Sequence, residues 1–214
     1  MARRLYELAA QQGVVSAIFS LGLMYYNGEG VEQSYERAKE YYEQAAHLGH
    51  ASAMYNLGLM YDNGEGVEQS YERAKEYYEH AAHLGYASAM FNLALLYKHG
   101  QGVEVSYERA KEYYEQAAHL GHANALYNLG ILYDYGKGVE QSDTIAREWY
   151  EKSADQGHAK AQSNLGTMYC NGKGVEVSYE KAKHFFELAA EQGNVLAQCN
   201  LADMYELGEG MPIS

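Results

Sequence analysis

The chain contains very little proline and little cysteine. One residue of 214 is proline, whereas 22 are glycine. Proline interrupts helix interiors, and glycine accepts turn conformations that other residues resist, so this balance favours a helical protein with glycine turns. Two cysteines, Cys170 and Cys199, are too few for an oxidised framework, which favours a reducing compartment.

Positive charge is also scarce. Lysine and arginine together number 16 against 29 aspartates and glutamates, which gives a formal net charge of −13. Nucleic-acid binding needs a cationic surface that displaces counterions from phosphates, and docking on anionic lipid needs the same sign of charge. The composition therefore argues against a nucleic-acid partner and against direct membrane binding.

Long apolar runs are missing as well. None approaches the ~20 residues that a helix needs to cross a bilayer. The opening MARRLYELAAQQ carries two arginines but lacks the apolar core of a signal peptide. These features do not fix the location of the protein, but they favour the cytoplasm.

The chain has instead a repeat with a period of 36 residues. The phrase GVEQSYERAKEYYE at residues 30–43 recurs unchanged at residues 66–79. Glycine keeps the same spacing at Gly13, Gly49, Gly85, Gly121, Gly157 and Gly193. Such a period is typical of solenoids, whose repeats stack because none can bury its apolar face alone.

The period divides a single repeat domain, residues 1–214, into seven parts. A partial repeat covers residues 1–12, and the full repeats cover residues 13–48, 49–84, 85–120, 121–156 and 157–192. A second partial repeat covers residues 193–214. Neither end has a polar capping unit, and Ser214 stands where a helix would begin. We expect a segment of a longer array, or a chain prone to head-to-tail self-association.

The first helix of each repeat is predicted from an apolar face. In the repeat 49–84, Ala53, Leu57, Met60 and Tyr61 follow the i, i+4, i+7, i+8 spacing of one side of a helix. The letters NGEG at residues 63–66 then break the pattern and predict a turn between two helices.

The second helix is predicted to begin at Ser70, a residue type that favours helix N-caps, and to stop at Gly85. We expect its buried side to hold alanines and tyrosines, namely Ala74, Tyr77, Tyr78, Ala81 and Ala82. The charged residues between them are expected to face water.

The pattern A-x-A-x-x-N-L-G-x-M-Y-x-x-G-x-G-V, followed by A-x-x-Y-Y-x-x-A-A-x-x-G, resembles the Sel-1-like repeat, a relative of the tetratricopeptide repeat. The resemblance extends over essentially the whole chain. It implies an all-α fold, a right-handed α/α superhelix of 36-residue helix-turn-helix repeats whose first helices line the concave face. It also implies an adaptor or scaffold that binds a partner protein or peptide.

A second side of the first helices is the candidate binding surface. Each first helix carries, away from its core stripe, residues that vary between repeats and include several aromatic ones. We call this set the arc: Phe19, Leu23, Tyr55, Leu59, Asp62, Phe91, Leu95, Lys98, Tyr127, Ile131 and Asp134. In one interpretation the rings and aliphatic side chains hold a peptide, and Asp62, Lys98 and Asp134 select it.

Other interpretations stay open. The arc rings are equally expected to pack against one another and the next helix, and its charges to be a plain solvated face. The chain is then purely architectural or self-associating, and its near-identical repeats also fit recent duplication or an engineered consensus. The asparagines at the repeat boundaries, Asn56, Asn92, Asn128, Asn164 and Asn200, are predicted to make structural hydrogen bonds.

Enzymatic chemistry finds little support. Ser178 and Lys181 fit the S-x-x-K nucleophile motif, but its companion motifs are missing and N-capping explains the serine. His80 and His83 share one helix, yet a metal site needs three or four converging ligands. We therefore expect that the protein is not an enzyme and that it has no catalytic residues, no metal and no cofactor.

Overall fold

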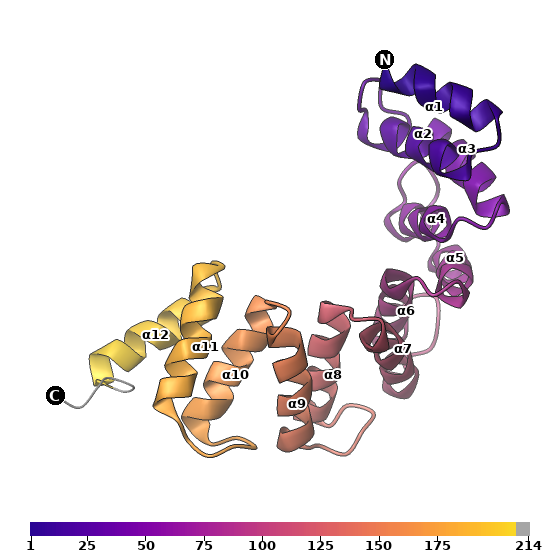
Figure 1. Ribbon diagram of the computed structural model, residues 1–214. Coiled ribbons are helices and arrows are strands. Elements are labelled where there is room, and N and C mark those ends of the chain that lie inside the picture. The colour runs from indigo at the N-terminus through magenta and orange to yellow at the C-terminus, as the bar shows by residue number, and fades with distance from the viewer. Residues whose placement is uncertain (209–214) are drawn as a thin grey trace. The chain divides into compact units, whose positions relative to one another are not determined.

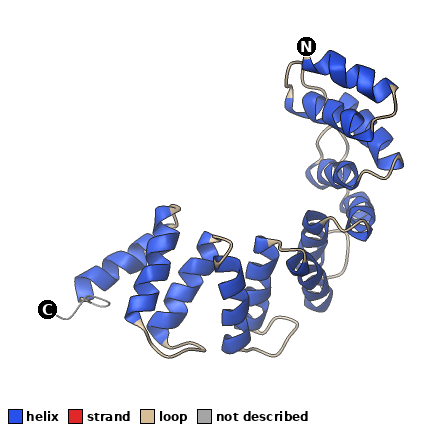
Figure 2. Ribbon diagram, viewed as in Figure 1, coloured by secondary structure: helices blue, strands red, loops and turns tan. Residues whose placement is uncertain are grey.

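The computed structural model describes residues 1–208, which are helical apart from short turns (Figures 1 and 2). The remaining positions, including Ser214 and the end of the trailing partial repeat, lie outside the described residues. The helices are α1 (Ala2–Gln11), α2 (Val15–Asn27), α3 (Tyr35–His47), α4 (Ala51–Asn63), α5 (Tyr71–His83), α6 (Ala87–His99), α7 (Tyr107–His119), α8 (Ala123–Tyr135), α9 (Asp143–Ala154), α10 (Ala159–Asn171), α11 (Tyr179–Glu191) and α12 (Val195–Leu207). The predicted all-α repeat fold is confirmed.

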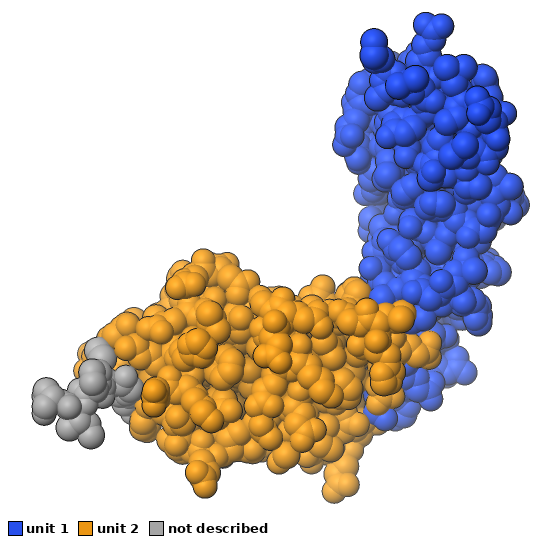
Figure 3. All heavy atoms as spheres, in the orientation of Figure 1, with its two compact units in different colours: residues 1–113 blue, residues 114–214 orange. Residues whose placement is uncertain are grey.

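The chain divides into two compact units, each of which is described separately below (Figure 3). Unit 1 comprises residues 1–113 and unit 2 begins at Tyr114, so the boundary falls inside α7. Within each unit, the first and second helix of a repeat form an antiparallel hairpin, and successive hairpins stack. The closest pairs are α2 with α3 and α4 with α5 in unit 1, and α8 with α9 and α10 with α11 in unit 2.

The helix boundaries follow the predicted signals. The Ser70 hydroxyl accepts a 3.3 Å hydrogen bond from the backbone N–H of Arg73, which caps α5. At the end of α4, Gly64 takes the left-handed conformation with φ of 74°, and its N–H donates to the carbonyl of Met60. A left-handed residue at this position is common where a helix ends, and glycine adopts it without steric cost.

The two helices of a repeat approach closely because one residue at their contact has no side chain. A Cβ atom on Gly58 of α4 would lie 2.5 Å from the ring of Tyr78 on α5. Gly22 and Tyr42 make the same contact in the preceding repeat, with a corresponding distance of 2.6 Å. The rings of Tyr42 and Tyr78 are fully buried, so the hairpin interface is a tyrosine seated on a glycine.

The predicted core stripe of α4 is confirmed, since Ala53, Leu57, Met60 and Tyr61 are all buried. The prediction for α5 needs one correction. Its Ala74, Tyr78 and Ala81 are buried, but Tyr77 and Ala82 are only partly buried.

The correction has a physical cause in the position of Tyr77. Its ring stacks on that of Tyr61 at 5.6 Å and borders an open pocket between α3 and α5. A helix that touches neighbours on two sides buries one stripe fully and leaves the flanking stripe at the edge of the contact.

Unit 2 has the same contact between a glycine of the first helix and an aromatic ring of the second helix. Gly130 of α8 lies against Tyr150 of α9, and Gly166 of α10 lies against Phe186 of α11, where a Cβ atom would come within 2.4 and 2.5 Å of the ring. Both rings are buried. The tyrosine hydroxyl is therefore not required for the seat itself, because phenylalanine fills it in α11.

Candidate functional site

The arc residues of unit 1 lie on α2, α4 and α6, and those of unit 2 lie on α8. All of them are half-buried, neither in the core nor fully open to solvent. On unit 1 these are Phe19, Leu23, Tyr55, Leu59, Asp62, Phe91, Leu95 and Lys98, and on unit 2 they are Tyr127, Ile131 and Asp134. Each unit therefore presents part of the arc on its first helices.

The aromatic rings of the arc are held by the residue that begins the next first helix. Phe19 stacks on His50 with ring centroids 4.5 Å apart, and Tyr55 lies 5.0 Å from Tyr86. In unit 2, Tyr127 stacks on His158 at 4.6 Å. These rings consequently have defined positions before any partner arrives, while part of each stays exposed.

Three histidines serve as helix N-caps. The Nδ1 atoms of His50, His122 and His158 accept hydrogen bonds from the backbone N–H groups of Ala53, Ala125 and Ala161. Burial lowers the pKa of all three imidazoles. The neutral form is the one that offers an acceptor nitrogen, so the shift favours the capping state.

The predicted selecting charges Asp62 and Asp134 are engaged inside the chain. Tyr78 donates a 2.9 Å hydrogen bond to Asp62, and Tyr150 donates one of 3.1 Å to Asp134. Burial raises the pKa of the Asp62 carboxyl, an effect that the hydrogen bond from Tyr78 opposes. The two aspartates thus link the arc to the buried ring of the same repeat.

The turn after a first helix carries a residue that contacts the first helix of the preceding repeat. In unit 2, Lys173 forms an ion pair with Asp134 and another of 3.4 Å with Asp143. In unit 1, Glu65 accepts a hydrogen bond from Tyr26. The Lys173–Asp134 and Glu65–Tyr26 contacts each join residues 39 positions apart. The sequence reasoning missed them, and the charges at this separation do not follow a common pattern, since Lys98 and Lys137 stand at the same two positions.

The boundary asparagine Asn128 makes structural hydrogen bonds. Asn128 accepts a 3.4 Å hydrogen bond from the buried Tyr114 hydroxyl and donates one of 2.8 Å to the carbonyl of Asn124. The bond from Tyr114 ties α8 to the preceding second helix, as the structural interpretation of this position predicted.

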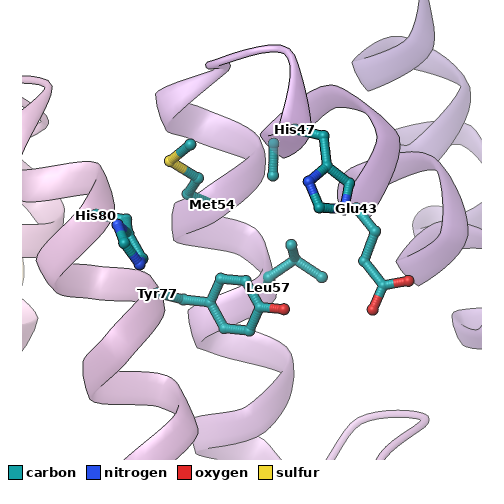
Figure 4. Close-up of a pocket in the computed structure, with 7 residues that line it drawn as sticks. Glu43, His47, Met54, Leu57, Tyr77 and His80 are labelled. Atoms are coloured by element: carbon teal, nitrogen blue, oxygen red, sulfur yellow. The ribbon is translucent and has the colours of Figure 1, made fainter.

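The structure also has a pocket that the sequence reasoning did not anticipate. It lies on the second-helix side of unit 1, between α3, α4 and α5, and has a volume of about 320 Å³ (Figure 4). Its lining residues are Glu43, Ala46, His47, Met54, Leu57, Tyr77 and His80. The sequence analysis expected the charged residues of the second helix to face water and treated His80 only as a possible metal ligand.

Among residues 1–208, no group of three or more histidine, cysteine, aspartate or glutamate side chains is arranged to hold a metal ion. Within the same range, the helices are too short or too polar to cross a lipid bilayer.

The repeat pattern matches a known family model, described as Sel1 repeat. The matches cover residues 1–14, 15–50, 51–86, 87–122, 123–158, 159–194 and 195–213. They keep the 36-residue period, with repeat boundaries two residues later than those given above. No curated protein sequence matches the chain significantly.

Solved structures with the same fold come from several bacteria. The protective antigen c5321 of uropathogenic Escherichia coli, which displays an SLR fold, is 35% identical with a TM-score of 0.94. The match covers 98% of this chain and 45% of that one, so the present chain spans less than half of its relative. A Sel1 repeat protein from Oxalobacter formigenes is 31% identical with a TM-score of 0.83, over 93% of this chain and 79% of that one.

Proposed function

The chain belongs to the Sel1-repeat family, and we propose that it is a non-enzymatic scaffold whose arc binds a partner protein or peptide. Proteins of this family are generally protein-interaction scaffolds without catalytic activity. A repeat array suits this role because each repeat adds a similar helix to one continuous face, and exchange of a few surface residues changes what the face recognises.

The observation that carries the proposal is the fixed position of half-exposed rings on the first helices. Phe19 stacks on His50 and Tyr55 packs against the tilted ring of Tyr86, so a partner that covers them orders few additional side chains. Rigid aromatic groups give large contact area at low entropic cost, which is why they dominate many binding surfaces. Because Asp62 and Asp134 already bind tyrosine hydroxyls, we infer that contacts to the arc are mainly apolar.

The test compares two double variants of the whole chain. A partner captured from the native cell is purified, and its affinity is measured by calorimetry for the wild type and for Tyr55→Ala with Phe91→Ala. The matched control is Tyr41→Ala with Tyr113→Ala, since these rings are also half-buried and stacked, on Tyr25 and Tyr97.

We expect the arc variant to lose affinity at least tenfold and the control to stay within twofold, with helical circular dichroism unchanged in both. Equal losses in the two variants would indicate general destabilisation. An arc variant that keeps full affinity would remove the arc from consideration as the binding surface.

A second candidate function, architecture through self-association, is favoured by exposed residues on α1 and α12. Tyr6 is 39% exposed, whereas Tyr42 and Tyr78 at the same repeat position are fully buried. Tyr205 is 47% exposed, whereas Tyr61 at its repeat position is buried. Sedimentation velocity over a hundredfold concentration range tests this candidate. Self-association predicts larger species that Tyr6→Glu removes, and a monomer throughout excludes it for this chain.

A further inference from the structure

The pocket between α3, α4 and α5 has an apolar floor and a polar rim (Figure 4). Met54 and Leu57 of α4 form the floor, while Glu43 of α3 and Tyr77 and His80 of α5 stand around it. At about 320 Å³ it lies at the lower end of the range typical for small-molecule pockets and is large enough for one long side chain.

This pocket is separate from the arc. Successive residues of a helix are rotated by about 100°, so Met54 and Leu57 project from the side of α4 opposite to Leu59, while Asp62 is rotated by about 80° from Met54 and about 140° from Leu57. The remaining lining residues belong to second helices, on which no arc residue lies. A molecule bound in the pocket therefore does not need to contact the arc, so binding there is independent of the proposed function.

The charge of the rim is negative at neutral pH. Of the seven lining residues, Glu43 is the one with a formal charge when histidine is neutral. Its carboxylate forms a 3.3 Å ion pair with Lys39 on the same helix and remains partly exposed. A carboxylate retains acceptor capacity for a further donor after one such contact.

The adjoining hollow extends this rim. It shares Glu43, Tyr77 and His80 with the pocket and adds Glu76, Lys39 and Arg73. Its Arg73 is already engaged, since its guanidinium donates a 2.9 Å hydrogen bond to the hydroxyl of Tyr61. Glu43 and Glu76 are thus the two carboxylates of this hollow, which also holds the cations Lys39 and Arg73.

An apolar floor with aromatic rings and a carboxylate at its mouth fits a side chain with an apolar stem and a cationic end. The chain itself contains this pairing. Arg37 lies over the ring of Tyr25 at 5.2 Å and Arg73 over that of Tyr61 at 5.3 Å, each donating to the tyrosine hydroxyl. Tyr77 offers a further ring of the same kind at the pocket.

We propose that this pocket binds an arginine side chain of a basic partner segment. The methylene stem lies along Met54 and Leu57, and the guanidinium donates to the Glu43 carboxylate beside the ring of Tyr77. Arginine suits this position better than lysine because its planar group both stacks on rings and donates two parallel hydrogen bonds to a carboxylate. The net charge of −13 favours the approach of basic segments over acidic ones.

The equivalent position on α10 of unit 2 has different chemistry. Gln162 stands where α4 has Met54, and it is buried in hydrogen bonds with Gln192 and with the carbonyl of Ala154. Leu188 stands where α5 has His80. A polar, hydrogen-bonded residue in place of the thioether offers no apolar floor, so the repeat that contains α10 lacks the proposed site.

The test titrates the whole chain with capped tripeptides, Ala-X-Ala, in which X is arginine, citrulline, leucine or glutamate. The readout is the methyl resonance of Met54 in NMR, assigned with Met54→Leu. We expect saturable shifts with the arginine peptide and at least fivefold weaker binding of citrulline, which has the same shape without the charge. Leucine and glutamate peptides are expected to bind more weakly still.

Variants of the rim sharpen the test. Glu43→Gln is expected to weaken arginine binding at least fivefold, and His80→Lys, which adds a fixed positive charge, to abolish it. The matched control is Glu79→Gln, since Glu79 occupies the same position one repeat later and forms the same kind of ion pair, 3.2 Å from Lys75. Binding to this control should stay within twofold of the wild type, and the double variant Tyr55→Ala with Phe91→Ala should retain it.

Several results would overturn the proposal. Equal binding of citrulline shows that charge is irrelevant, and tighter binding of leucine or glutamate identifies an apolar or an anionic occupant instead. A Met54 resonance that shifts with protein concentration alone shows that a second copy fills the pocket. The absence of saturable binding by the arginine peptide shows that the pocket is not an arginine-binding site.

Discussion

The hydroxyl of Tyr78 donates a 2.9 Å hydrogen bond to the carboxylate of Asp62, sixteen residues earlier in the chain. The tyrosine ring is fully buried against α4, while the aspartate is half-buried on the arc. Tyr150 and Asp134 form the same pair in unit 2. A residue that looks in the sequence like a selecting charge is therefore also part of the hairpin interface.

This pair leads to a prediction about pH. Burial raises the pKa of the Asp62 carboxyl in the folded protein, so the folded state takes up a proton before the unfolded state as the pH falls. The stability of the wild type relative to Asp62→Asn should increase from pH 7 towards about pH 4, the ordinary range of an aspartate, and decrease again as the pH rises. Urea unfolding of both proteins at several pH values measures this difference, and a difference that shrinks on acidification contradicts it.

The second prediction concerns the tyrosine seat. Gly58→Ala places a Cβ atom 2.5 Å from the ring of Tyr78. Alanine favours a helix over glycine by about 1 kcal/mol, but displacement of a buried ring costs about 1–3 kcal/mol. We expect a net loss of about 1 kcal/mol in the free energy of unfolding, measured by urea denaturation.

A smaller partner should relieve this clash. Gly58→Ala combined with Tyr78→Leu should be less harmful than the sum of the single changes, because the two residues touch. Gly49→Ala is the control, since its Cβ would meet no atom within 4 Å and its cost comes only from a φ of 82°. Its effect should simply add to that of Tyr78→Leu.

The third prediction concerns the start of α5. Ser70→Ala removes the acceptor for the backbone N–H of Arg73 and should lower the free energy of unfolding by about 1 kcal/mol. Ser70→Asp should retain most of the stability, because its carboxylate accepts the same bond and suits the positive end of the helix dipole. Thermal unfolding followed by circular dichroism distinguishes the two, and equal losses would indicate that the hydroxyl is not used as a cap.

The fourth prediction concerns the ion pairs of Lys173 with Asp134 and Asp143. Lys173→Met should cost unit 2 about 0.5–1 kcal/mol at low salt, as expected for a partly exposed charge network. The cost should decrease at 1 M salt, where screening acts over about 3 Å. Lys183→Met provides a comparison, since its 3.9 Å pair with Glu187 lies within one helix and is expected to contribute less. A loss that is independent of salt contradicts an electrostatic role.

The repeat made much of the fold readable. The spacing of Ala53, Leu57 and Tyr61 predicted the core stripe of α4, and Ser70 and Gly64 predicted where helices begin and end; all of these are confirmed. Such signals are local, because a helix face and a cap depend on residues within a few positions of one another. Repetition then tests each signal several times within one chain.

The candidate site was less readable. The eleven arc residues were identified as one side of the first helices, and the structure places them half-buried on α2, α4, α6 and α8. That they bind a partner stays a proposal. The stacking of Phe19 on His50 and the bond between Tyr78 and Asp62 could not be predicted from the helix period. They depend on the rotation of one helix against another, which a pattern within a single helix does not specify.

The residues alone determine the period, the helix pairs, their caps and the family, since these depend on short-range sequence order repeated many times. Tertiary structure decided which charges are used internally and where the surface is hollow. Glu43 and His80 lie 37 positions apart on two second helices that both face water in the pattern, yet they border one pocket over Met54 and Leu57. Stacking of separate helices brought them together, because the gap between two neighbouring helices depends on the side chains of both.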